Sequence, residues 1–405
     1  MMGAMTVNDS SEVVVVGAGP AGLTAAIAMA QAGVETTLIA RKAPADSRTT
    51  ALLAGSMTAL DTLGVWKRCA HESAPLKIMR IVDATARLLR APEVSFSAEE
   101  IGLEAFGHNI ENKYLVAALE ARARELPSLK LIEDEASAVE TGDDNVTIRL
   151  KNGGTVTARL AVGADGRRSL CRSAAGIETS GSRYPQTALT FNLAHSRPHK
   201  FTSTEFHSEG GPFTLVPLPG DRSSLVCVVE PADARKLSTL DDDALAHEIE
   251  RRSHSILGKI KVEQGRGEFP LSIENARQFA ANRIALVGEA AHLIPPIGAQ
   301  GLNLGLRDAA TIGELAVAAR RDGEDVGADE LLRRYDTARR ADVQSRSFAI
   351  DLMNRSLLTD FLPVQGARGL GLFLIDRIGP LRRALMREGV APRAAQPRLM
   401  RGEAL

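Results

Sequence analysis

The sequence predicts an α/β fold that is divided into two domains and ends in helices. Three features indicate this architecture: a β-branched run with a glycine-rich turn near the N-terminus, two later apolar runs that each end in an acidic turn, and a strand-rich stretch between those two runs. A chain of 405 residues is too long for one ordinary hydrophobic core, so we expect a second domain.

Composition narrows the class of protein. Hydrophobic residues make up 44% and charged residues 24% of the chain, a balance typical of globular proteins. The formal net charge is -1, and the lack of a basic excess argues against binding to nucleic acid. The three cysteines form no CxxC pair and no metal-binding spacing, which favours a reducing, cytoplasmic compartment and no metal site.

Neither the N-terminus nor the apolar stretch after it predicts a membrane span. Residues 1–12 are polar and are expected to be a disordered lead-in. Residues 13–33 are apolar, but glycine and proline interrupt them at positions 17, 19, 20 and 22, as in a strand, a turn and a helix. Any membrane contact is therefore expected to be peripheral, at the inner face of the membrane.

The first motif predicts a dinucleotide-binding turn. The run Val13–Val16 predicts a strand buried on both faces, and Leu23–Ala32 predicts the helix that follows. Between them lies Gly17-Ala18-Gly19-Pro20-Ala21-Gly22, a GxGxxG motif in the strand–turn–helix context that it requires. Its first glycine allows the tight turn, its second lets the backbone approach a pyrophosphate, and its third lets helix and strand pack closely. The helix N-terminus offers free N–H groups to phosphate.

The second expected strand, Val34–Ala40, lacks the acidic residue that usually binds the adenosine ribose. Ala40 occupies that position, and Arg41 follows it. We therefore expect Arg41, or the backbone beside it, to make the ribose contact. This motif alone does not separate FAD from NAD.

Two later segments share the pattern of a buried strand that ends in a carboxylate. The first apolar run starts at Leu160 and leads to Asp165, and the second starts at Ile284 and leads to Gly288 and Glu289. A proline corner and a glycine-rich entry into a helix follow the second run. A carboxylate at a strand end can accept hydrogen bonds from sugar-alcohol hydroxyls, and the N–H groups of the helix can face an electron-rich ring.

Taken together, these segments resemble the signatures of the para-hydroxybenzoate hydroxylase superfamily of single-component FAD monooxygenases. They match its GxGxxG, its DG motif and its GD motif, in that order and over nearly the whole chain. Residues 296–308, PIGAQGLNLGLRD, are most similar to the subgroup of ubiquinone-biosynthesis hydroxylases. Glu289 stands where many relatives have Asp, which shifts its carboxylate by one methylene.

The resemblance implies a set of residues around the FAD. Arg48 and Asn112 match positions that lie near the cofactor in the family, and the three motifs supply the others. The expected set is Gly17, Gly19, Pro20, Ala21, Gly22, Arg41, Arg48, Asn112, Asp165, Gly288, Glu289, Pro296, Gly298, Gln300, Gly301, Leu302 and Asn303.

The resemblance also implies a reaction. FAD, reduced by NAD(P)H or by a partner electron donor, takes up O₂ as co-substrate, and the resulting C4a-hydroperoxide transfers one oxygen atom to a phenolic ring. The expected substrate is an aromatic small molecule, prenylated if it is a ubiquinone precursor. The sequence does not identify the catalytic base. His292 and Pro296 are candidates, with a structural or flavin-environment role favoured for His292.

Two other functions stay open. In the first, the chain hydroxylates a small soluble aromatic acid, whose pocket needs an anchoring Arg or Lys where a prenylated ring needs a long apolar channel. In the second, the chain is a non-catalytic FAD-binding scaffold of a quinone-biosynthesis complex, an interpretation supported by Ala40 and Glu289. A halogenase is disfavoured because Trp66 is the only tryptophan, and a disulfide reductase because no redox cysteine pair is present.

The predicted fold is therefore a Rossmann-like FAD-binding domain with a second, mixed-sheet substrate domain and a helical C-terminus. We expect the FAD-binding domain to comprise residues 1–75, 97–184 and 276–345. Residues 185–275 should form the substrate domain, and residues 76–96 should add strands to it. Residues 346–405 should form the C-terminal helices.

The expected C-terminal helices carry an apolar stripe with arginines around it. The stripe consists of Leu370, Leu374, Ile378, Leu381 and Leu385, and the arginines are Arg368, Arg377, Arg382, Arg383 and Arg387. One interpretation is a pair of helices packed on the body of the protein. The other is a basic amphipathic surface for a membrane or for a partner in a quinone-biosynthesis complex.

Overall fold

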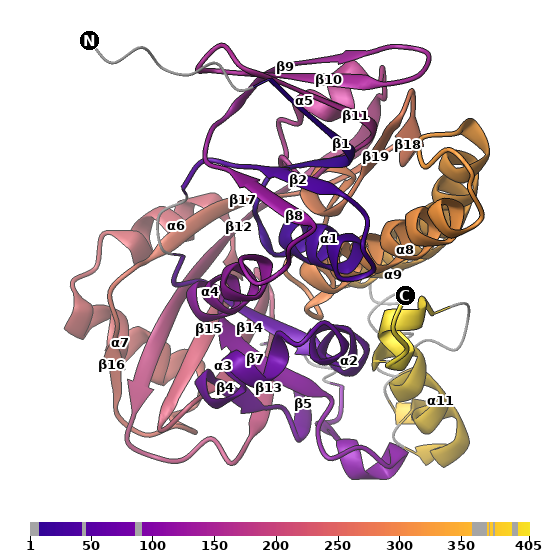
Figure 1. Ribbon diagram of the computed structural model, residues 1–405. Coiled ribbons are helices and arrows are strands. Elements are labelled where there is room, and N and C mark those ends of the chain that lie inside the picture. Colours follow the sequence, from indigo (N-terminus) through magenta and orange to yellow (C-terminus); the bar gives the residue numbers. More distant parts are fainter. Residues whose placement is uncertain are drawn as a thin grey trace.

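The computed structural model describes residues 8–42, 46–85, 91–358, 371, 373–375, 377–390 and 396–405. Within these residues the chain forms two large sheets and one small sheet, with helices packed around them (Figure 1). The α/β class and the Rossmann-like domain, the mixed sheet and the C-terminal helices expected from the sequence are all confirmed.

The first sheet has a parallel centre formed by the strands that precede the glycine turn and the two acidic turns. Its spatial order is β18 (Ala280–Ala281), β19 (Ile284–Leu286), β11 (Thr155–Gly163), β1 (Asn8–Val16), β2 (Thr36–Ile39) and β8 (Leu129–Ile132). The antiparallel strands β9 (Ala136–Thr141) and β10 (Val146–Leu150) extend it beside β11. Because β1, β11 and β19 run parallel, Gly17, Asp165 and Gly288 follow them at one edge of the sheet.

The second sheet is mixed and receives strands from distant parts of the chain. Its spatial order is β20 (His292–Leu293), β17 (Gly267–Ala276), β12 (Thr179–His195), β15 (Arg222–Val229), β14 (Gly211–Leu218), β13 (Thr202–Ser208), β5 (Ile78–Asp83) and β6 (Val94–Ser97), with β16 (Ile260–Val262) beside β12. The pair β5–β13 is parallel, whereas the other pairs are antiparallel. α6 (Pro231–Ser238) and α7 (Asp242–Arg252) pack on this sheet through Leu237, Leu245 and Ile249.

Smaller elements connect the two sheets. The third sheet consists of β3 (Thr49–Leu53), β7 (Gly107–Glu111) and β4 (Ser73–Pro75). The helices near it are α2 (Ala54–Thr62), α3 (Trp66–Cys69) and α4 (Asn112–Ala123), and α5 (Leu170–Ala174) follows β11. Asn109 on β7 donates to the carbonyl of Pro217 and to the hydroxyl of Ser224, which ties the third sheet to the second.

Three long helices complete the molecule. α1 (Pro20–Gln31) packs on α8 (Gln300–Arg321), and both belong to the largest hydrophobic core. α9 (Asp329–Leu358) packs along α8 and continues onto strands β14 and β17 of the second sheet. It therefore contacts both parts of the molecule (Figure 1). The residue boundaries of the domains stay a prediction. Some of them fall within single elements: for example, the boundary at 184/185 lies inside β12, which begins at Thr179, and the boundary at 345/346 lies inside α9.

At the N-terminus the expectation of a disordered lead-in was wrong for residues 8–12. β1 starts at Asn8 and pairs with β11 from that residue onward. The backbone hydrogen bonds of the ladder stabilise this end, and its polar side chains remain partly exposed, so the strand needs no apolar residues there. Residues 1–7 lie outside the described residues.

The C-terminal apolar stripe does not pack on the body. Leu374, Ile378, Leu381 and Leu385 have exposed fractions of 39–46%, and Leu370 lies outside the described residues, as does Arg368. α11 (Gly379–Val390) does contact the body, but through Met386 and Val390, which join a small core with Phe106. The interpretation of helices packed on the body therefore holds for α11, but the four described residues of the stripe do not make that contact.

Candidate active site

A cavity of about 710 Å³ is lined by residues of both large sheets. The first sheet contributes the turns after β1, β11 and β19, and the second sheet contributes β12, β15 and β17. Of the expected FAD set, the lining includes Gly19, Pro20, Ala21, Gly22, Arg48, Asn112, Gly288, Glu289, Pro296, Gly301 and Leu302. The volume lies in the usual range for ligand sites in proteins.

The glycine turn has two positions that need glycine for packing and one that faces open space. A Cβ atom at Gly22 would lie 2.0 Å from the carbonyl oxygen of Gly17. A Cβ atom at Gly17, whose φ is 109°, would lie 2.3 Å from the carbonyl oxygen of Ala164. A Cβ atom at Gly19 would meet nothing within 4 Å. Gly17 and Gly22 thus let the strands and α1 approach closely, whereas Gly19 leaves the cavity side of the turn open.

Two helix N-termini meet at the cavity, and neither has a side-chain cap. α1 starts after Gly19 and α8 starts after Ala299, without a capping hydrogen bond from either residue. The residues of their first turns line the cavity. Free N–H groups and the positive ends of two helix dipoles favour anionic groups there, so the site fits a pyrophosphate at α1 and an electron-rich flavin ring at α8.

Arg48 and Asn112 meet through a carboxylate that the sequence analysis did not single out. Asp46 accepts from Arg48 Nε at 2.9 Å and from Asn112 Nδ2 at 2.9 Å, and Asn112 in turn accepts from Thr50. Burial opposes the charged form of Asp46, but the hydrogen bonds from Arg48 and Asn112 hold the pKa of its carboxyl below the usual value. The guanidinium of Arg48 also lies over the ring of Phe269, 5.4 Å from its centroid.

The acidic residues of the second and third motifs behave differently. Asp165 accepts from the Ser169 hydroxyl at 2.6 Å and from the Cys171 amide at 3.1 Å, so its carboxylate holds the start of α5 and does not line the cavity. Glu289 lines the cavity and has an exposed side chain. The hydrogen bond to Asp46 raises the pKa of Arg48, and the negative charge of Glu289 adds to this effect.

Four further members of the expected set, Arg41, Gly298, Gln300 and Asn303, are absent from the cavity lining. Arg41 is exposed at the end of β2. Asn303 accepts from the Leu53 amide and donates to the Ala51 carbonyl, which fastens α8 to β3. Gln300 donates to the Gly298 carbonyl and accepts from Arg346. These bonds hold the entry into α8 in place.

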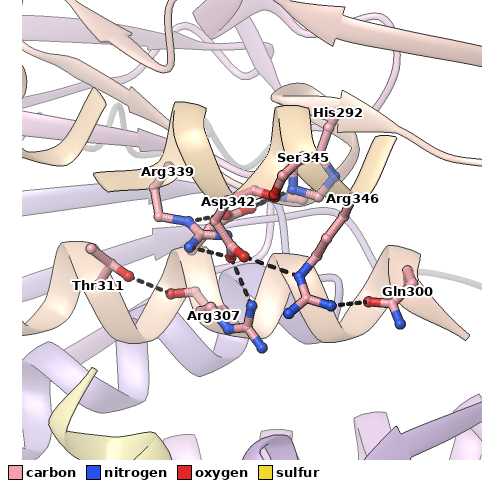
Figure 2. Close-up of polar contacts among 10 residues, drawn as sticks. His292, Gln300, Arg307, Thr311, Arg339, Asp342, Ser345 and Arg346 are labelled. Atoms are coloured by element: carbon pink, nitrogen blue, oxygen red, sulfur yellow. Dashed lines mark hydrogen bonds and ion pairs between the residues drawn. The ribbon is translucent and has the colours of Figure 1, made fainter. Parts of the chain in front are cut away.

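His292 is buried at the cavity wall and belongs to a network between α8 and α9 (Figure 2). Its Nε2 atom lies 2.6 Å from Oδ2 of Asp308, and Arg339 Nε donates to Oδ1 of Asp308 at 2.6 Å. Burial opposes the charged form of Asp308, but His292 and Arg339 hold the pKa of its carboxyl below the usual value. Pro296 lines the cavity but has no titratable group.

Sequence reasoning missed the α9 side of this network. Arg339, Asp342 and Arg346 recur at the spacing of one helix face, and Asp342 accepts from both arginines. It also accepts from Arg307 on α8. The spacing alone predicts a charged helix face, and only the packing of α9 on α8 shows that this face is turned inward.

The wall formed by the second sheet has no Asp, Glu, Lys or Arg in its lining, and its ionisable side chain is His292 on β20. Its other lining residues are Ala188, Thr190, Phe191 and Asn192 of β12, Ser224, Leu225 and Val226 of β15, Phe269, Pro270, Leu271 and Ser272 of β17, and Leu293 of β20. The charged residues of the lining are Asp46, Arg48, Arg167 and Glu289, which belong to other segments. Among the described residues, no group of His, Cys, Asp and Glu is placed to hold a metal ion.

Comparison with known proteins agrees with this geometry. The FAD binding domain family matches residues 10–346. The ubiquinone hydroxylase UbiL of Rhodospirillum rubrum is 36% identical, over 97% of this chain and 93% of that protein. The 3-demethoxyubiquinol 3-hydroxylase of Escherichia coli is 31% identical, over 94% of this chain and 98% of that protein.

Solved structures share the fold at lower identity. The p-nitrophenol 4-monooxygenase PnpA of Pseudomonas putida superposes with a TM-score of 0.77 at 19% identity, covering 96% of this chain and 100% of that one. Klebsiella pneumoniae HpxO, complexed with FAD and uric acid, gives a TM-score of 0.72 at 20% identity, covering 93% and 97%. The chain therefore belongs to the FAD binding domain family of FAD-dependent aromatic monooxygenases, in the subgroup of the ubiquinone-biosynthesis hydroxylases.

Proposed function

We propose that this chain hydroxylates the aromatic ring of a ubiquinone precursor. The observation that carries the proposal is the wall of the cavity on the second sheet, which lacks Asp, Glu, Lys and Arg. A ring with a prenyl tail needs an apolar surface, because burying the tail removes it from water, whereas a small aromatic acid needs a cation to pair with its carboxylate. The relatives named as ubiquinone hydroxylases support the same substrate class.

The residues of the cavity divide between cofactor and substrate. The N-terminus of α1, with Gly19 at its open side, would hold the FAD pyrophosphate, and the N-terminus of α8 would face the flavin ring. FAD supplies the activation of O₂, with reducing equivalents from NAD(P)H or a partner electron donor. The protein orients the ring of the substrate and keeps water away from it. Phe269 and Leu271 on β17 are placed for both tasks.

The direct test uses purified protein that is loaded with FAD and given NADH, ¹⁸O₂ and a prenylated phenol. The proposal expects a product that carries one oxygen atom from O₂, detected by mass spectrometry. Under the same conditions a soluble hydroxybenzoate should react poorly. Faster turnover of the hydroxybenzoate than of the prenylated phenol would contradict the proposal.

The alternative substrate, a small aromatic acid, has one specific feature in its favour. Arg167 lines the cavity and donates to the hydroxyl of Ser272 on β17 at 3.2 Å, so it lies next to the substrate wall. If the substrate is an acid, Arg167→Ala should raise its KM strongly, because the carboxylate loses its counter-charge. For a neutral prenylated ring the same change should leave KM nearly unaltered.

We also propose a peripheral contact with an anionic membrane surface. Phe348 and Leu352 on α9 have exposed fractions of 69% and 59%, and the exposed stripe of Leu374, Ile378, Leu381 and Leu385 follows along the chain. Arg383 and Arg387 lie on α11 together with Leu381 and Leu385, so basic and apolar residues share this helix, as in helices that lie on anionic lipid. Among the described residues, no helix combines the length and apolar character that crossing a membrane requires.

A further inference from the structure

Asp308 links the wall of the cavity to the helices behind it. It lies on α8, is fully buried, and uses both oxygen atoms of its carboxylate. Oδ2 accepts from the Gly288 amide at 3.0 Å and faces Nε2 of His292 at 2.6 Å. Oδ1 accepts from Nε of Arg339 on α9 at 2.6 Å. A single carboxylate thus contacts two segments of the cavity wall and one helix outside it.

The turn that Asp308 holds has little room to move. Gly288 has a φ of 59°, which is the left-handed region, and a Cβ atom there would lie 3.3 Å from Ala21 of α1. A Cβ atom at Gly305 of α8 would likewise lie 3.1 Å from the Gly288 Cα atom. Glu289 follows directly and lines the cavity. The position of its carboxylate therefore depends on how firmly the Gly288 amide is held.

The surroundings of His292 favour one tautomer of its ring. The carboxylate of Asp308 can only accept, so Nε2 of His292 carries the proton of their shared bond. Nδ1 is buried and has no hydrogen-bond partner among the described residues. A proton on Nδ1 in place of Nε2 would leave a buried donor unsatisfied and would remove the donor that faces Asp308.

We propose that Asp308 is a positioning residue, whose Oδ2 atom holds the Gly288 amide and the Nε2–H tautomer of His292 and so fixes the Glu289 wall of the cofactor site. His292 then directs its ring proton, on Nε2, at Asp308. It serves as a fixed part of the wall, not as a proton donor to the substrate. Arg339 neutralises Asp308 from behind, which allows a carboxylate to sit in this buried place.

The first test measures the tautomer directly in the protein without substrate. The chain has eight histidines, and the ¹⁵N signals absent from the His292→Gln spectrum identify His292. We expect a protonated Nε2 and an unprotonated Nδ1 at neutral pH. A protonated Nδ1 would overturn the proposal. This readout depends on neither turnover nor the identity of the substrate, so it stands apart from the proposed reaction.

The second test compares two double variants that remove the same two charges. In Asp308→Asn/Arg339→Met, the amide oxygen can still accept from the Gly288 amide and from His292, and the missing guanidinium leaves no unpaired charge. In Asp308→Leu/Arg339→Met, both acceptors are lost. We expect the first double variant to bind FAD nearly as the native protein does and to keep the His292 tautomer. The second should bind FAD about tenfold or more weakly.

A matched control separates positioning from general loss of stability. Asp325 also accepts from an arginine, Arg283, and from a backbone amide, that of Gly327, but it does not line the cavity. Asp325→Leu should lower Tm and leave FAD affinity unchanged. Equal FAD affinity in the two double variants would overturn the proposal. If that equal affinity were also lower than in the native protein, the charge of Asp308, and not its hydrogen bonds, would be what matters.

Discussion

The glycine turn has a role in folding and a role in ligand binding, and Gly19 is the position whose missing side chain leaves space for a ligand. Its φ of -68° and ψ of 169° are allowed for any residue, and a Cβ atom added there would have no neighbour within 4 Å. Gly17 and Gly22 are instead closed in by backbone atoms of neighbouring segments. Binding and folding can therefore be tested separately within one motif.

The variant Gly19→Val should fold and lose FAD. Its Tm without FAD should match that of the native protein, because the added methyl groups point into open space. FAD affinity should fall by ~100-fold, or about 2.8 kcal/mol, because the backbone can no longer approach the pyrophosphate. Gly22→Ala should instead lower Tm, since its Cβ atom would collide with the Gly17 carbonyl. Normal FAD retention by Gly19→Val in a fluorescence titration would contradict this account.

At the residue scale, local sequence predicted which backbone turns line the cavity, but not which partner each polar side chain takes. The glycine turn and the turn at Gly288 follow from their strand–turn–helix context. Asp165 was expected at the cofactor, but a nearer partner, the start of α5, takes its carboxylate. Asp46 and Arg339 were missed because their partners, Asn112 and Asp308, are 66 and 31 positions away in the sequence.

At the element scale, α9 joins the two halves of the molecule through polar contacts along its length. Its N-terminal and middle turns meet α8 through Arg339, Asp342 and Arg346. Its second half meets the second sheet, where Asn354 donates to Gln186 and Tyr184 donates to Asp351. The sequence predicted helices from residue 346 onward, but the choice of partners for the charged face of α9 depends on packing between segments.

The stability that the ion pairs between α8 and α9 contribute should decrease on acidification. Burial opposes ionisation of Asp342, but Arg339 and Arg307 hold the pKa of its carboxyl well below 3.8, and that of Asp308 is lowered as well. A carboxyl whose pKa is lower in the folded state contributes stability above its unfolded pKa and loses it as the pH falls further. The Tm difference between the native protein and Asp342→Asn should therefore be constant at neutral pH and shrink below about pH 4.

The comparison requires thermal melts of both proteins across the same buffers. Glu403→Gln serves as the control, because the ion pair of Glu403 with Arg401 is exposed and should contribute little at any pH. A Tm difference for Asp342→Asn that already shrinks between pH 7 and pH 5 would show that these carboxyls are not held ionised as described.

At the scale of the whole molecule, the cavity and the exposed apolar side chains are what the proposed membrane-soluble substrate would require. The second-sheet wall, which lacks Asp, Glu, Lys and Arg, forms one side of the cavity, and α9, which packs on that sheet, carries Phe348 and Leu352 to the exposed surface. Sequence alone predicted the two-domain architecture from its motifs. It did not decide whether the C-terminal stripe was buried, because an apolar helix face can pack on the same chain, on a partner or on a membrane.

The exposed surface should bind anionic vesicles in a way that depends on its arginines. Arg383→Ala and Arg387→Ala should each weaken binding about fivefold, since one basic residue near an anionic surface contributes about 1 kcal/mol. Arg333→Ala is the control: Arg333 is exposed on the same helix as Phe348 but roughly 22 Å away along its axis. Vesicle flotation that responds equally to all three changes, or to none, would argue against a membrane surface here.

The central claim, hydroxylation of a ubiquinone precursor with FAD, is tested most directly by a quinone profile of cells that lack this protein. Mass spectrometry should show a prenylated phenol that lacks one oxygen atom. The intact gene should clear this intermediate, and a copy that encodes Gly19→Val should not. A normal quinone profile in the deletion strain, or clearance of the intermediate by the Gly19→Val copy, would contradict the claim.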